Sequence, residues 1–191
     1  MESNQLLSPQ LNEIKIQLDN ASIKAVSIVS GVSLEQLNQR PQFNQWSIAE
    51  CLVHLNLSNM AEIEVLNDAY QQARAQPAHV KNQFKMDLLG RFLKWMLEPP
   101  PMFLSKIKTT ERFQPIDIEP LSEILPRFLV LQEQLKSSVD AVNGLPLDRI
   151  KVVSPFNTKV KYNLLSFFHI LLAHERRHLW QAEKVKEAII Q

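Results

Sequence analysis

The chain has few of the residues that build turns, disulfides or large sheets. Its 191 residues include only three glycines and one cysteine, and aromatic residues make up 7%. A hydrophobic share of 45% with so little glycine favours a mostly helical chain. The lone Cys51 excludes an intramolecular disulfide and is typical of a reducing compartment. This length predicts one domain spanning residues 1–191.

An excess of either charge is also lacking. The 21 basic and 20 acidic residues give a net charge of +1, and no basic patch is interleaved with aromatics, so we expect no nucleic-acid partner. No apolar run approaches the roughly 20 residues that span a bilayer. The first residues lack the charged and apolar regions of a signal peptide. We therefore expect a soluble, cytoplasmic protein with no membrane partner.

What the chain does contain is hydrophobic periodicity of the helical kind. Apolar residues recur in steps of three and four over four long segments, which predicts four amphipathic helices. Their starts carry recognisable signals, such as Ser8 before Pro9 and the capping box Ser47-x-x-Glu50. Pro126 is expected to kink the third helix or to delay its start. The predicted helices cover residues 8–29, 47–75, 121–142 and 163–190.

The connections are less regular. A short amphipathic helix is predicted over Phe84–Leu97, ended by three consecutive prolines. A connection packed against the bundle is the simpler interpretation of this helix, and a lid, a dimer contact or a membrane-surface element is the functional one. Short extended segments are possible over Leu147–Tyr162. The predicted fold is an all-α four-helix bundle with an extra short helix between its second and third helices.

Two histidines interrupt the apolar stripe of the last helix. His174 and His178 are four residues apart, so they lie one above the other, about 6 Å apart along the axis. Two imidazoles at this spacing can share a metal ion but cannot complete its coordination. His54, on the flank of the second helix, is a weak candidate for a third ligand when taken alone. His79 and His169 are expected to be ordinary residues.

Two motifs resemble those of a known family. The stretch from Trp46 to Leu55 resembles the W-S-x-x-E-x-x-x-H-L signature of the DinB-like superfamily, and the stretch from His174 to Gln181 resembles its H-x-x-R-H-x-x-Q signature. The helix order matches over nearly the whole chain. Members are four-helix bundles, often dimeric, in which one histidine of the second helix and two of the fourth bind a divalent metal. The resemblance therefore implies a metal site of His54, His174 and His178.

The resemblance also implies a class of chemistry. Characterised relatives include transferases and isomerases that use low-molecular-weight thiols, and others are described as metal-dependent hydrolases. Three neutral imidazoles leave positions open for water or substrate and suit Zn, Ni, Fe or Mn. We expect a metal-dependent enzyme acting on a small molecule, a thiol-dependent transferase or a hydrolase, with a non-catalytic metal or ligand-binding module as the alternative. A homodimer is expected from the resemblance and from the apolar Phe84–Leu97 stretch.

Supporting residues can be nominated around the histidines. Glu175 is the candidate general base, although a plain surface position is the simpler interpretation because it is rotated about 100° from His174. Glu50 lies one turn before His54 and could orient it. Gln181, one turn past His178, is a candidate contact to the metal's surroundings or to substrate. Cys51 could touch the site, with a small buried cysteine as the favoured interpretation.

A remote alternative comes from the same residues. The order His174-Glu175-x-x-His178 also fits the H-E-x-x-H pattern of zinc proteases, in which the glutamate acts as general base. Such a site needs a third ligand, and only Glu183 and Glu187 follow on the same helix. Neither is well placed, since Glu183 falls off the histidine face and Glu187 lies more than two turns away.

Overall fold

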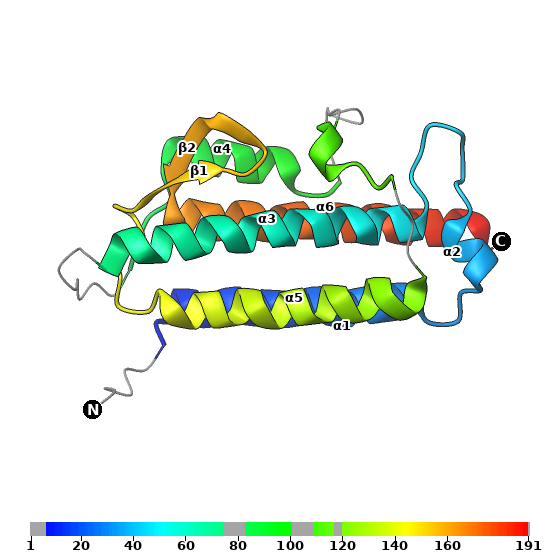
Figure 1. Ribbon diagram of the computed structural model, residues 1–191, viewed down its shortest axis with the longest axis horizontal. Coiled ribbons are helices and arrows are strands. Elements are labelled where there is room, and N and C mark those ends of the chain that lie inside the picture. Colours follow the sequence, from blue (N-terminus) through cyan, green and yellow to red (C-terminus); the bar gives the residue numbers. More distant parts are fainter. Residues whose placement is uncertain (1–6, 75–82, 101–108, 117–119, 191) are drawn as a thin grey trace.

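The fold is a four-helix bundle, as predicted. A computed structural model describes residues 7–74, 83–100, 109–116 and 120–190. The long helices run side by side, with α3 and α6 forming one layer and α1 and α5 the other (Figure 1). Their bounds are α1 (Pro9–Val29), α3 (Ile48–Arg74), α5 (Leu121–Ala141) and α6 (Leu164–Ile189).

The ends of these helices follow the local signals of the sequence. The Ser8 side chain accepts a hydrogen bond from the Leu11 N–H at 3.3 Å, with Pro9 in the first turn of α1. At the start of α3, the Glu50 N–H donates to Ser47 Oγ at 3.1 Å and the Ser47 N–H donates to Glu50 Oε2 at 2.8 Å. This reciprocal pair is the predicted capping box. The delayed start considered for Pro126 was wrong, because α5 begins at Leu121 and continues through it.

The core consists of two apolar clusters with a polar belt between them. One cluster gathers Leu11, Leu135 and Phe167 with their neighbours, and the other gathers Ile28, Phe128 and Leu179 with theirs. Between these clusters each of α3, α5 and α6 contributes buried polar side chains. These side chains are His54, Asn56, Ser58, Asn59, Glu62, Gln132, His174, Glu175 and His178.

The connections contain a short helix and a 3-10 turn that the sequence did not predict, and a hairpin where extended segments were expected. A five-residue helix, α2 (Leu34–Asn38), begins at its own Ser33 capping box in the linker between α1 and α3. The short extended segments expected over Leu147–Tyr162 form a hairpin of β1 (Lys151–Ser154) and β2 (Asn157–Asn163), which leads into α6 with Lys151 paired to Asn163 in antiparallel register. A 3-10 turn, η1 (Glu111–Phe113), contacts α3.

The predicted extra helix is α4 (Leu88–Leu97), and it lies with the hairpin on the outside of the α3–α6 layer (Figure 1). It packs against α6 and approaches it very closely at Gly90. A Cβ at Gly90 would collide with the side chain of Ser166. The absence of a side chain at Gly90 is therefore what allows the two helices to meet at this distance.

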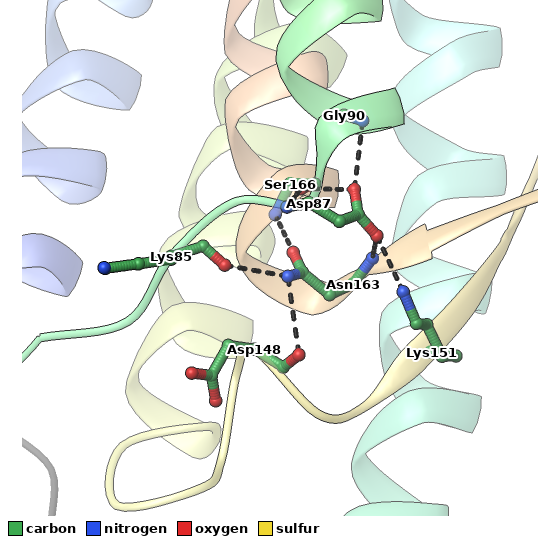
Figure 2. A network of polar contacts seen from close by, with 7 residues as sticks. All are labelled: Lys85, Asp87, Gly90, Asp148, Lys151, Asn163 and Ser166. Carbon is green, nitrogen blue, oxygen red and sulfur yellow. Dashed lines mark hydrogen bonds and ion pairs between the residues drawn. The ribbon is translucent and has the colours of Figure 1, made fainter.

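A polar cluster around Asp87 fastens this outer layer to α6 (Figure 2). Asp87 Oδ1 accepts from the Gly90 N–H and from Ser166 Oγ, both at 3.0 Å. Asp87 Oδ2 accepts from Lys151 Nζ at 2.7 Å and from the Asn163 N–H at 2.8 Å. One carboxylate thus joins the start of α4, the start of α6 and the hairpin. Burial alone would raise the pKa of Asp87, but the Lys151 cation and the donated hydrogen bonds lower it overall.

Candidate metal centre

The bundle brings together three histidines from two helices in its polar belt. His54 comes from α3, and His174 and His178 come from α6. One nitrogen from each ring lies within 4.8 Å of the others, and the Nε2 atoms of His54 and His174 are 3.2 Å apart. All three side chains are buried, with exposed fractions of 2%, 7% and 9%. The helical spacing of His174 and His178 places these two rings edge to face with their centres 4.7 Å apart, and the packing of α3 on α6 adds the third.

Hydrogen bonds at the far nitrogens orient two of the rings. His54 Nδ1 lies 2.8 Å from the carbonyl oxygen of Phe113, which can only accept, so Nδ1 carries the proton and Nε2 keeps its lone pair. His178 Nδ1 lies 3.1 Å from Gln181 Oε1, which fixes the same tautomer. His174 Nδ1 is buried without a hydrogen-bond partner among the described residues. A ring that donates its other N–H to a carbonyl or amide oxygen is the usual support of a metal-binding histidine.

The surroundings hold the histidines in the neutral form that a metal requires. Burial lowers the pKa of His54 to about 4, although the Phe113 carbonyl acts in the opposite direction. Burial also lowers the pKa of His174 and His178 well below the ordinary value, and the neighbouring histidines and the Arg177 cation add to this shift. Neutral imidazoles near pH 7 have the free lone pairs that divalent metals bind.

Aromatic rings pack around the three histidines. The Trp46 ring lies 4.9 Å from that of His54 and 5.7 Å from that of His178, centre to centre. Phe156, in the turn of the hairpin, lies 5.0 Å from His174 and 4.8 Å from Phe113. The sequence analysis did not predict the roles of Phe113 and Phe156. The contribution of Phe113 is a backbone carbonyl, which no residue pattern reveals.

Glu175 is not the surface residue that its rotation from His174 suggested. Its side chain is fully buried, with an exposed fraction of 0%. Its Oε1 accepts from Asn59 Nδ2 at 2.9 Å and from Gln132 Nε2. Burial raises the pKa of Glu175 to about 7, although both amides act in the opposite direction. The carboxyl group therefore joins α6 to α3 and α5 within the core, a role that the sequence analysis missed.

Glu50 forms the predicted capping box and has no hydrogen bond to His54 among those of the described residues. Its carboxylate accepts from the Ser47 N–H and forms an ion pair with Arg40, which lies in the linker before α3. The ring that Glu50 was expected to orient is held by the Phe113 carbonyl instead. Glu50 consequently fixes the start of α3, one turn before His54.

The remaining candidates lie apart from the histidine group. Glu183 pairs with Lys24, and Glu187 pairs with Lys184 at 2.6 Å, so both carboxylates are engaged in ion pairs. Cys51 is buried, and burial raises the pKa of its thiol, as expected of a small core residue. His169 is not a member of the group of three. His79 lies outside the described residues.

A helical bundle with three converging histidines from its second and fourth long helices defines a class of candidate metalloproteins. The family model described as the DinB superfamily matches residues 17–182, and the chain belongs to that superfamily. It is 24% identical over 177 residues to the uncharacterized protein YuaE of Bacillus subtilis (strain 168), covering 90% of this chain and 96% of that protein. No solved structure gives a significant match.

The family and the histidine group together fit a metal-binding protein. Among the helices that the structure describes, none is long and apolar enough to cross a membrane.

Proposed function

We propose that the three histidines bind one divalent metal ion, and that the protein is a metal-dependent enzyme acting on a small molecule. The observation that carries this proposal is the convergence of His54, His174 and His178. Hydrogen bonds at Nδ1 orient two of these rings. Zn, Ni, Fe and Mn all suit such a donor set. A bound divalent ion would supply positive charge that lowers the pKa of a coordinated water or thiol.

The positions of the carboxylates favour a thiol-dependent transferase over a hydrolase. Hydrolysis commonly uses a protein base to take a proton from water. Within the described chain, the close group of potential ligands contains three histidines and no carboxylate. Glu175 and Glu50, the two nominated bases, hydrogen-bond to core amides and to a helix start respectively. A low-molecular-weight thiol ionises far more readily than water does, so its reaction would depend less on such a base.

The same observation supports a second candidate, a metal or small-ligand binding module without turnover. A site whose close group of potential ligands contains no carboxylate can hold a ligand without converting it. A zinc protease receives no such support, because the third member of the close group of potential ligands is His54 rather than Glu183 or Glu187. The homodimer and the cytoplasmic location remain predictions.

Metal-loaded protein assayed with low-molecular-weight thiols and model electrophiles tests this proposal. We expect consumption of both substrates by the wild type and none by His54→Ala, with His169→Ala as a matched control that keeps its activity. Metal content, measured on the same samples, separates the candidates. Metal bound in stoichiometric amount without turnover would favour the binding module, and wild-type protein that binds no divalent metal would refute both.

A further inference from the structure

The outer face of α4 is apolar and exposed. Four large side chains form this α4 face: Leu88, Leu89, Phe92 and Trp95, with exposed fractions of 81%, 42%, 55% and 55%. The inner side of the same helix is occupied, because Gly90, Leu93 and Leu97 face α6 and the core. The packed side and the outward side of α4 are therefore both apolar.

Both ends of α4 are fastened, so the α4 face is a fixed feature of the fold. At the start, the Asp87 carboxylate holds the helix to Ser166 and Lys151 (Figure 2). At the end, the Glu98 carboxylate pairs with Arg176 Nε at 3.0 Å, and Arg176 Nη1 also donates to Gln17 at 2.7 Å. These bonds hold one side of α4 against α6, and the other side stays directed outward.

Basic residues are concentrated in α4, in the residues just before it and in the neighbouring hairpin. Residues 83–98 and 151–163 contain six basic and two acidic side chains, a net charge of +4 in a chain whose net charge is +1. The two acids, Asp87 and Glu98, are paired with Lys151 and Arg176. The hairpin lies beside α4 in Figure 1, and the Lys151–Asp87 ion pair joins them. The six basic residues are Lys85, Arg91, Lys94, Lys151, Lys159 and Lys161.

We propose that α4 and the hairpin dock on an anionic lipid surface, with Leu88, Phe92 and Trp95 inserted at the interface. A helix with Leu, Phe and Trp on one side and Lys or Arg beside them is the type that lies in the plane of a membrane surface. Such contact needs no spanning helix. It differs from the expectation of no membrane partner, which rested on the absence of a spanning segment.

The positive charge of α4 and the hairpin favours a lipid surface over a second copy of the chain as the partner of the α4 face. Two α4 faces packed together would bring two sets of basic side chains close to one another, and the repulsion would oppose association. Anionic lipid headgroups complement the same charges, at about 1 kcal/mol for each Lys or Arg near the surface. The aromatic and leucine side chains would be buried at the boundary between the headgroups and the acyl chains.

Co-sedimentation of the full chain with vesicles tests the proposal. We expect binding to vesicles of phosphatidylglycerol mixed equally with phosphatidylcholine, and much weaker binding to phosphatidylcholine alone. Replacing Phe92 and Trp95 together by Ser should lower the partition coefficient about tenfold or more. Phe43→Ser is the matched control, because Phe43 is 97% exposed on a distant loop and its loss should leave binding unchanged. Arg91→Ala should weaken binding roughly fivefold.

Tryptophan fluorescence distinguishes insertion from adhesion by charge alone. Emission of the wild type should shift to the blue on addition of the anionic vesicles, and Trp95→Phe should keep the binding and lose most of the shift. Three results would overturn the proposal: no binding to the anionic vesicles, equal binding by the Phe92 and Trp95 double variant, or a dimer in sedimentation that dissociates in that variant.

Discussion

Two polar clusters lie along α6, one at its start around Asp87 and the other at its middle around the three histidines. At the start, four hydrogen bonds occupy both carboxylate oxygens of Asp87 (Figure 2). Asn163 Oδ1 also accepts from the Ser166 N–H at 2.8 Å. In the middle, the ring nitrogens of His54 and His174 face each other at 3.2 Å, and His174 Nδ1 has no partner among the described residues.

The difference between the two clusters indicates how buried polar groups that stabilise the fold can be told from those of a candidate binding site. Burying a polar group is costly unless it is paired, so a cluster whose members satisfy one another stabilises the fold. Groups with converging lone pairs and few donors lower stability, so they are candidates for binding a partner. The Asp87 cluster is of the first kind and the histidine group of the second. Each prediction below tests one side of this contrast.

The largest effect is expected for His54→Ala, which removes the proposed metal ligand that α3 contributes. Metal affinity should fall roughly a hundredfold or more, because losing even an outer support of a ligand costs 10- to 100-fold. Isothermal titration with Zn²⁺ or Ni²⁺ measures this effect. His169→Ala should bind as the wild type does, and full affinity retained in His54→Ala would contradict the triad.

Asp87→Ala should lower the free energy of unfolding by about 3 kcal/mol and leave metal affinity unchanged. It removes the acceptor of four hydrogen bonds that join α4, α6 and the hairpin. Urea denaturation provides the measurement. The control is Asp140→Ala, which breaks the more exposed ion pair with Lys15 and should cost less than about 1 kcal/mol. Equal losses in the two variants would show that the cluster is not a fastening point.

Glu175→Gln tests a residue that lies next to the histidines in sequence and belongs to the core in structure. The amide keeps an oxygen to accept from Asn59 and Gln132, so we expect a loss of about 1 kcal/mol in stability with metal binding and turnover retained. Both quantities should be measured on the same preparation. Loss of turnover with metal affinity intact would instead assign Glu175 to the chemistry.

The smallest effect concerns His169, a histidine of α6 that belongs to neither cluster. Burial, with the nearby Lys94 and Arg176 cations, lowers its pKa to about 4 from an ordinary 6.5. The folded state therefore binds the proton more weakly than the unfolded chain, and stability falls as the pH drops from 6.5 toward 4. His169→Gln should reduce this acid sensitivity by an amount on the order of 1 kcal/mol near pH 5. Parallel acid unfolding curves for the two proteins would refute the assignment.

The expectation that Glu175 is a surface residue was wrong, and it shows where helical periodicity stops predicting burial. A single apolar stripe predicts one buried face, and Glu175 lies off that stripe. In the structure, however, Ile170 to Glu175 are buried without interruption. The cause is that α6 packs on α1 and α3 and is also covered by α4 and the hairpin. A helix surrounded in this way has little outward face at its middle.

The sequence by itself determined the helices of this protein and the placement of two of its histidines. The stripes determined four long helices, the Ser47–Glu50 pair determined where α3 starts, and the spacing of His174 and His178 placed two imidazoles on one face, because 3.6 residues complete each turn. Only the tertiary structure brought His54 to them across 120 positions, set the Phe113 carbonyl behind its ring and buried Glu175 against Asn59 and Gln132. The physical reason is that geometry within one helix is set by its own backbone bonds. Contacts between helices depend instead on how whole side-chain surfaces pack together.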